Sequence, residues 1–171
     1  MEKLNLILFL PAMLLVLVLP GLAWPAAFAR GGLLLAAASE KGGGPCMPTP
    51  ADALGPFYQP DAPVRDRVGQ GYVLSGAVRS ADGCVPLAGA RLEFWLAGPD
   101  GVYDEEHRAT MFSGPEGTYR FESNFPPQYS FRPPHIHLKV SADGFKTLVT
   151  QHYPVAGQPR GTMDLVLVPS R

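Results

Sequence analysis

One short segment of the chain gathers side chains that can bind a metal ion. It runs Tyr129-Ser-Phe-Arg-Pro-Pro-His135-Ile-His137 and holds one phenol, one guanidinium and two imidazoles. On a β-strand two histidines spaced two apart point to the same face, and the isoleucine between them points to the other. A second phenol, Tyr103, lies earlier in the chain after a turn. Two neutral nitrogen donors and two phenolates suit a hard, highly charged ion better than zinc, and ferric iron is the natural candidate.

Each of these features also has an ordinary structural explanation. A His-x-His pair on a strand is often only a polar face, and tyrosines at a sheet edge commonly keep their hydroxyls in water. A cupin-type site needs a glutamate soon after the pair, but the chain continues Leu138-Lys-Val-Ser-Ala142. A histidine-rich copper site needs more imidazoles, and His107 and His152 lack matching spacing. No nucleophile-elbow motif supports a hydrolase. The joint occurrence beside Arg132 favours a metal site.

The elements that must position these side chains are predicted to be short strands joined by tight turns. The chain has 171 residues, a net charge of −1, 19 glycines, 19 prolines and an apolar fraction of 46%. The apolar fraction argues against disorder, and the balanced charge gives no basic field to hold nucleic acid. Turn sequences that end in glycine recur at 80–83, 98–101, 114–117 and 141–144.

Alternating or apolar runs lie between these turns. In one of them Leu92, Phe94 and Leu96 alternate with polar or aromatic residues. No segment after residue 40 has a helical period. We therefore predict an all-β protein, a single domain over residues 46–171 with an antiparallel β-sandwich fold. Residues 52–67 hold four prolines or glycines and are predicted to form an irregular arm across the surface. The predicted strands are 72–79, 90–97, 118–123, 135–141, 147–153 and 163–168.

The start of the chain differs in composition from the rest. Lys3 precedes a nearly apolar run to Ala23, and Ala27-Phe-Ala29 has the small-residue pattern of a cleavage site. We expect a secretory signal peptide over residues 1–29 and a flexible linker over residues 30–45. The protein is then expected to be exported to the periplasm or the extracellular space, and an uncleaved leader would tether it to the membrane.

Two cysteines, Cys46 and Cys84, are present. In an exported protein an even pair favours a disulfide, and two separate buried thiols are the alternative. A bond between them would close a loop of about 38 residues. On the chain-entropy model it would stabilise the fold by roughly 4 kcal/mol.

The chain resembles the intradiol ring-cleavage dioxygenases, a family that includes catechol and protocatechuate dioxygenases, and is most similar to their small exported single-domain branch. The resemblance runs from about Cys46 to Val168. Both cysteine positions are also similar to that branch, which supports the disulfide. The matching segments are Thr49–Tyr58, Cys84–Trp95, Gly101–Tyr103, Pro126–Tyr129, Arg132–His137 and Thr150–Tyr153.

The resemblance implies a cofactor and a reaction. The cofactor is non-haem ferric iron, Fe(3+), held by Tyr103, Tyr129, His135 and His137. The reaction is the opening of a catechol ring by O2 between its two hydroxylated carbons, which gives a muconate-type diacid. The implied partners are a small aromatic diol and O2, and the oligomeric state stays open.

The resemblance also implies catalytic and pocket residues. In the family one tyrosine ligand is displaced by the catechol and takes up a proton, and the resemblance implies this catalytic role for Tyr129. Arg132 is implied to stabilise negative charge on the substrate ring, and Gln151 to lie near the open coordination face. Tyr58 is implied to form part of the pocket wall. Two non-enzymatic alternatives remain, a transthyretin-like or carbohydrate-binding sandwich, and an exported iron-catecholate-binding protein without turnover.

Two features depart from the family pattern. Leu96 stands where a polar residue is frequent, and an acidic cluster, Asp104–Glu106, directly follows Tyr103. We expect these residues to alter the pocket and to disfavour anionic aromatics such as protocatechuate. The apolar Leu96 segment favours neutral or bulky catechols.

Overall fold

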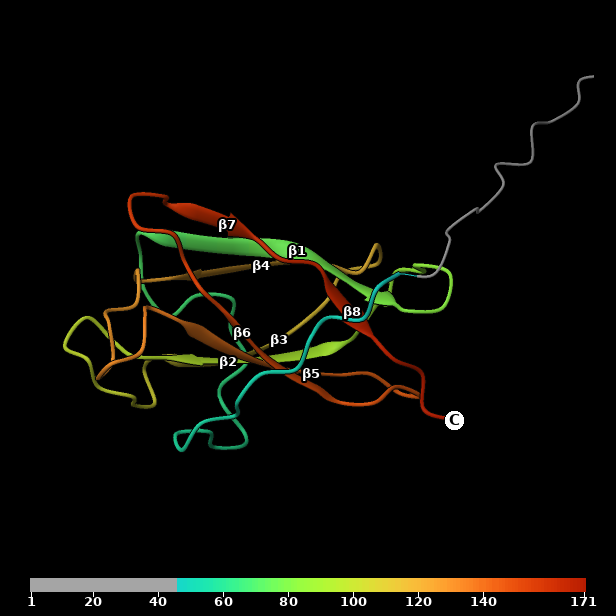
Figure 1. Cartoon of the computed structure of the whole chain (residues 1–171), viewed down its shortest axis with the longest axis horizontal. Coiled ribbons are helices and arrows are strands. Elements are labelled where there is room, and N and C mark those ends of the chain that lie inside the picture. Colours follow the sequence, from blue (N-terminus) through green and yellow to red (C-terminus); the bar gives the residue numbers. More distant parts are fainter. Residues whose placement is uncertain (1–45) are drawn as a thin grey trace, which may run out of the picture. The chain divides into compact units, whose positions relative to one another are not determined.

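The computed structural model describes residues 46–171, which form eight strands and no helix (Figure 1). The predicted signal peptide and linker, residues 1–45, lie outside this range. Within the described range there is no helix able to cross a membrane. The strands are β1 (Tyr72–Ser80), β2 (Arg91–Leu96), β3 (Arg108–Phe112), β4 (Thr118–Ser123), β5 (Ile136–Ser141), β6 (Leu148–His152), β7 (Arg160–Thr162) and β8 (Leu165–Leu167).

Two four-stranded sheets make up the fold, which confirms the predicted all-β sandwich. One sheet has the order β4-β1-β7, with β8 also paired to β1, and the other has the order β3-β2-β5-β6. The second sheet is antiparallel throughout. In the first sheet β1 pairs in parallel with both β7 and β8, so this sheet is mixed rather than purely antiparallel. Parallel neighbours need a long crossover, and residues 81–159 lie between β1 and β7.

The core lies between the inward faces of the two sheets. Phe94 of β2 stacks on Phe121 of β4, with ring centroids 4.2 Å apart. The alternation seen in the sequence places Leu92, Phe94 and Leu96 in this core. The apolar character of Leu96 therefore serves packing, and the expectation that it alters the substrate pocket was wrong.

The outer face of the β3-β2-β5-β6 sheet is covered by residues 46–71, which we call the arm. Asp52 donates its backbone N–H to Val149 of β6 at 2.9 Å. Further along, Thr110 of β3 donates to the carbonyl of Pro63 at 2.8 Å. The arm, the teal to green trace in Figure 1, thus crosses the sheet from β6 to β3 in an irregular conformation, as predicted. Because of this cover, outward residues such as Trp95 are buried.

A disulfide joins Cys46, at the start of the arm, to Cys84, with 5.2 Å between the Cα atoms. This confirms the predicted pair. Cys84 lies in the connection that enters β2 at Arg91. The connection to β3 leaves from the opposite end of β2, where Leu96 pairs with Ile136. The disulfide and the histidine segment therefore lie at opposite ends of this sheet.

Candidate metal centre

The two predicted imidazoles lie on the outer face of the sheet at the start of β5. His137 pairs with Trp95 of β2, and His135 immediately precedes the strand. Their Nε2 atoms are 3.1 Å apart, and both side chains are buried. The alternation that sends Ile136 into the core directs both histidines to the opposite side, as the sequence predicted.

Two loops bring phenols to these imidazoles. Tyr103 comes from the β2–β3 connection, and its hydroxyl oxygen lies 3.1 Å from Nε2 of His135. Tyr129 comes from the β4–β5 connection, and its ring stands edge-on to that of Tyr103 with 5.4 Å between centroids. All four predicted donors line one pocket of about 120 Å³. The other lining residues are Gly55, Pro56, Phe57 and Arg132.

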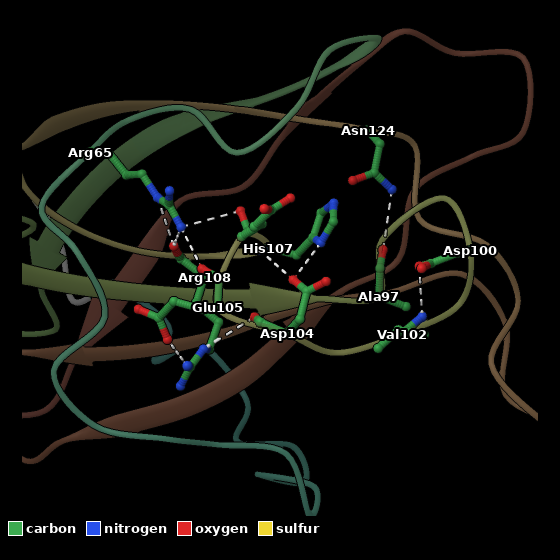
Figure 2. Close-up of polar contacts among 10 residues, drawn as sticks. Arg65, Ala97, Asp100, Val102, Asp104, Glu105, His107, Arg108 and Asn124 are labelled. Atoms are coloured by element: carbon green, nitrogen blue, oxygen red, sulfur yellow. Dashed lines mark hydrogen bonds and ion pairs between the residues drawn. The ribbon is translucent and has the colours of Figure 1, made fainter.

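Polar contacts fix the loop that carries Tyr103 (Figure 2). Asp104 accepts hydrogen bonds from the backbone N–H and the ring Nδ1 of His107, at 3.1 and 2.8 Å. Arg65 of the arm donates to the carbonyl of Arg108, where β3 begins, at 2.7 Å. The loop is thereby closed on itself and attached to the arm, which sets the place of Tyr103 relative to β5.

The ring of His137 is held by two neighbours. Trp95 stacks on it, with centroids 4.8 Å apart and ring planes 7° from parallel. Gly55 of the arm has φ +72°, and a Cβ atom built on it would lie 2.9 Å from Cε1 of His137. A side chain at position 55 would therefore displace the imidazole. The arm backbone and a buried indole together restrict His137 to one orientation.

Both imidazoles are neutral and present nitrogen lone pairs. Nδ1 of His135 lies 2.8 Å from the carbonyl oxygen of Pro133. A carbonyl only accepts, so Nδ1 carries the proton and Nε2 is free to bind a metal. Burial lowers the pKa of His135. Burial, the adjacent His135 and Arg132 lower the pKa of His137 to about 4. Neutral imidazole is the form that ligates metals.

The donor set fits a hard cation. Nitrogens that share one ion at about 2.1 Å lie roughly 3 Å apart, close to the 3.1 Å between the two Nε2 atoms. Burial and the neighbouring Tyr129 raise the pKa of Tyr103 to about 12, so this phenol ionises at neutral pH only if a cation replaces its proton. Among residues 46–171 no three His, Cys, Asp or Glu side chains gather as metal ligands. The two tyrosines in the pocket bring the donor set beside the two histidines to four.

A hydrogen-bonded network holds a cation at the edge of this pocket. Arg132 donates to Oε1 of Gln151 and to the hydroxyl of Tyr153, both at 2.9 Å. Tyr153 in turn donates to Oδ2 of Asp52 at 2.7 Å, and Gln151 donates to the carbonyl of Ala53 at 2.6 Å. The predicted catalytic pair, Arg132 and Gln151, is therefore in direct contact, and both ends of the network reach the arm.

Tyr58 lies outside the pocket that holds the four donors. Its hydroxyl donates to the buried Glu93 at 3.1 Å and accepts from Lys139 at 2.5 Å. Its ring packs edge-on against Trp95, at 5.1 Å between centroids. The neighbouring Phe57 lines the pocket instead, stacked on Tyr103 at 4.4 Å. Tyr58 thus anchors the arm to the sheet, and Phe57 supplies the aromatic wall.

The acidic cluster also points elsewhere. The Asp104 carboxylate is engaged by His107, and Glu105 forms an ion pair with Arg108. None of the three acidic residues is among the described residues that line the pocket. The cluster therefore does not form part of the pocket wall, and the side chains of Asp104 and Glu105 stabilise the loop. That the cluster disfavours anionic aromatics stays a prediction.

Sequence reasoning missed several contributors to the site. Gly55 and Phe57 lie in a segment already matched to the family, and the Gly-Pro pair there signalled an unusual backbone. Tyr153 follows Gln151 by two residues on an extended segment, which placed it on the same face. Asp52 and Trp95 carried no local signal, since their contacts arise from the packing of the arm on the sheet.

Comparisons with known proteins match this arrangement. No family model matches the sequence. The chain is 33% identical over 132 residues to a hydroxyquinol 1,2-dioxygenase of Rhizobium sp. (strain MTP-10005), covering 57% of this chain and 44% of that protein. It is 31% identical over 145 residues to a chlorocatechol 1,2-dioxygenase of Pseudomonas putida, covering 64% of this chain and 55% of that protein. The chain spans about half the length of the curated relatives it matches.

Solved structures of dioxygenases are also similar to this chain, and one alignment covers a whole domain. The dioxygenase domain of a dioxygenase carbohydrate-binding protein fusion from Streptomyces sp. SirexAA-E aligns with a TM-score of 0.64 and 30% identity, over 72% of this chain and 100% of that domain. A 3-chlorocatechol 1,2-dioxygenase from Rhodococcus opacus 1CP shares the fold, with a TM-score of 0.65 and 16% identity over 71% of this chain and 73% of that one. With a His-Tyr donor set in one pocket and a full-length match to such a domain, the chain belongs to the intradiol ring-cleavage dioxygenase family.

Proposed function

We propose that this chain is a non-haem Fe(III) dioxygenase that opens a catechol ring with O2 between its two hydroxylated carbons, giving a muconate-type diacid. Both oxygen atoms enter the product, so no external reductant is needed. The observation that carries the proposal is the convergence of two phenols and two neutral imidazole nitrogens in one pocket beside a fixed guanidinium.

Tyr103, Tyr129, His135 and His137 would hold the iron. When bound, ferric iron would supply Lewis-acid chemistry, drawing charge from a catechol and making its ring carbons reactive toward O2. The donor types support this choice, since anionic phenolates stabilise the ferric state. Because Tyr103 has a pKa of about 12 without metal, loading the site releases its proton.

The chain's own residues contribute orientation, proton transfer and charge. Phe57, which stacks on Tyr103, supplies an aromatic wall of the pocket. We assign Tyr129 the role of taking up a catechol proton, because it lies in the pocket and no hydrogen bond to another described residue holds its hydroxyl, whereas the Tyr103 hydroxyl lies 3.1 Å from Nε2 of His135. Arg132 supplies a fixed positive charge at the pocket edge, where negative charge develops on the ring. Gln151 holds that guanidinium through its Oε1 atom.

The decisive experiment compares iron content, colour and oxygen uptake in one preparation. Protein expressed with iron should carry about one iron per chain, show the red-brown colour of phenolate-to-iron charge transfer, and consume O2 with catechol. Arg132→Ala should keep the iron and colour but lose about 10²–10³ in kcat, the usual cost of removing a group that stabilises developing charge. Arg120→Ala removes an exposed arginine on the other sheet, and it is expected to behave as wild type.

Each alternative has a distinct signature in this experiment. Iron and colour without oxygen uptake, over several catechols, would replace turnover by iron-catecholate binding. A colourless protein that takes up no iron would indicate the other alternative, a binding β-sandwich in which the tyrosines and histidines hold no metal. Full activity of Arg132→Ala would contradict the assigned role of Arg132.

We also propose that the protein works outside the cytoplasm, in the periplasm or the extracellular space. The support is the Cys46–Cys84 disulfide, which oxidising compartments preserve. Cell fractionation with an antibody against the folded domain tests the location.

A further inference from the structure

The pocket at the metal centre is too small for more than one aromatic ring. Its volume is about 120 Å³, whereas pockets that enclose drug-sized ligands measure about 300–1,000 Å³. A substituent on the ring must therefore extend through the mouth and rest on the surrounding surface. The chemistry of that surface decides which substituents are accepted.

Among the described residues, the pocket has no second cation for a charged substituent. Of the described residues that line it, Arg132 alone carries a charge. That guanidinium already donates to Gln151 and Tyr153, and Tyr153 connects it to the Asp52 carboxylate. That cation is already assigned to the negative charge that develops on the ring, so a carboxylate on the ring would meet no second cation among these residues. The pocket therefore favours an uncharged ring.

Three exposed apolar residues are next in sequence to residues that line the pocket. Leu54, Val102 and Phe131 are 39%, 50% and 90% exposed. Each is next in sequence to a residue that lines the pocket, so its Cα lies about 3.8 Å from that of a lining residue. The three come from separate segments, namely the arm, the β2–β3 connection and the β4–β5 connection. We call these three residues the apolar rim.

Phe131, the most exposed residue of the apolar rim, lies in a tight turn. Arg132 donates its backbone N–H to the carbonyl of Tyr129 at 3.0 Å, and both residues line the pocket. Ser130, at the corner, has φ +55°, a conformation that non-glycine residues adopt at a cost in energy. Phe131 is the other corner residue, so an exposed aromatic side chain lies on the turn between two residues that line the pocket.

We propose that the substrates are uncharged catechols with an apolar alkyl or aryl substituent that leaves the pocket and packs on the rim, chiefly on Phe131. This inference rests on the proposed ring cleavage and narrows its substrate class. The apolar segment around Leu96 led to the same expectation of neutral or bulky catechols. Leu96 itself lies in the core, so we attribute this preference to the apolar rim instead.

The test compares catechol, 4-butylcatechol and 3,4-dihydroxybenzoate on iron-loaded protein, with kcat/KM from oxygen uptake. Wild type should prefer 4-butylcatechol to the carboxylated ring by at least about tenfold. Phe131→Ser should lower kcat/KM for 4-butylcatechol about tenfold and leave catechol unchanged. Met47→Ser is the matched control, because Met47 is 88% exposed beside the disulfide at the far end of the sheet, and it should change neither substrate.

Anaerobic calorimetry provides a readout that does not depend on turnover. The butyl chain should add affinity with a more negative heat-capacity change, the mark of apolar burial, and Phe131→Ser should remove that increment. Equal effects of Phe131→Ser on catechol and 4-butylcatechol, or a preference for the carboxylated ring, would overturn the inference. If no catechol is cleaved but Phe131→Ser still weakens 4-butylcatechol binding, the ring-cleavage proposal fails while the apolar subsite stands.

Discussion

Arg132 is positioned by a chain of hydrogen bonds in which the donor and the acceptor of each bond are determined. Tyr153 has a single hydroxyl hydrogen, which it donates to Asp52, so its oxygen is free to accept from Arg132. The hydrogen bond from Tyr153 lowers the pKa of Asp52, which keeps this carboxylate ionised at neutral pH. The guanidinium is therefore oriented by a tyrosine and a glutamine, and it keeps its charge for the pocket without a direct carboxylate partner.

Tyr153→Phe tests this chain. The change removes the hydroxyl that accepts a hydrogen bond from Arg132 and leaves Gln151 as the other partner of the guanidinium. Because a hydrogen bond to a charged group contributes about 1.5–3 kcal/mol, kcat with catechol should fall about tenfold. Iron content and KM should stay at wild-type values, which steady-state kinetics and metal analysis check. Asp52→Asn keeps an acceptor for Tyr153 and should retain most activity. Loss of iron together with activity would show that Tyr153 supports the fold instead.

At this scale, the sequence predicted residues on strands better than residues on the arm. His135 and His137 could be placed on one face because strand alternation is local and regular. Tyr58 and Phe57 are adjacent on an irregular segment without a period, so the sequence could not tell which one faces the pocket. The carboxylates of Asp104 and Glu105 contact His107 and Arg108 for a similar reason, since these partners are set by the closure of the loop.

The arm is the element on which the site most depends. It supplies three lining residues, covers the imidazoles, and carries the anchors of Arg132 and Gln151. At Gly55 the backbone of the arm lies so close to the predicted ligand His137 that a side chain would not fit. The sheet presents the histidines, and the arm determines whether they are enclosed.

Gly55→Ala should therefore impair metal binding beyond its effect on stability. The positive φ costs alanine about 1–2 kcal/mol, and its Cβ would meet the His137 ring at 2.9 Å. Gly144→Ala is the matched control, because Gly144 has φ +80° but no atom within 4 Å of its added Cβ. Both variants should lose unfolding free energy in urea titrations, Gly55→Ala the more because of its contact with His137, but only Gly55→Ala should lose iron per chain. Equal iron content in the two variants would contradict the role of Gly55.

Strands with clear alternation were predicted to within a residue or two, and two others were missed. β3 (Arg108–Phe112) is Arg-Ala-Thr-Met-Phe, without a simple alternation, and it forms a strand because β2 and the arm bond to it on either side. β7 (Arg160–Thr162) has three residues and exists only through its parallel pairing with β1. Pairing between distant segments leaves no local pattern, which is also why the mixed first sheet was not predicted.

For the molecule as a whole, the disulfide closes a loop that contains the whole arm and β1. Replacing both Cys46 and Cys84 by serine should lower the unfolding free energy by about 2–4 kcal/mol, measured by denaturant titration. Wild-type protein should show no free thiol when titrated unfolded without reductant. Iron content should persist in the variant, because hydrogen bonds to β6 and β3 still hold the arm on the sheet. An unchanged midpoint would mean that the bond does not restrict the unfolded chain.

Stability and chemistry occupy opposite faces of the same sheet. The inner face of β2 and β5 is the packed core, and the outer face carries the histidines, the indole and the arm. Substitutions in the core should therefore change unfolding more than metal affinity, and substitutions under the arm should do the reverse.

Because β5 contributes one face to the core and the other to the site, its length can change in evolution only in certain steps. Inserting one residue directly after His137 would rotate the rest of the strand by one pleat, so Lys139 would point into the core and Leu138 out of it, or else the histidines would turn inward. Inserting two residues would restore both faces. Related chains should thus tolerate length differences in this strand in even steps, while the loops around the pocket vary by any number.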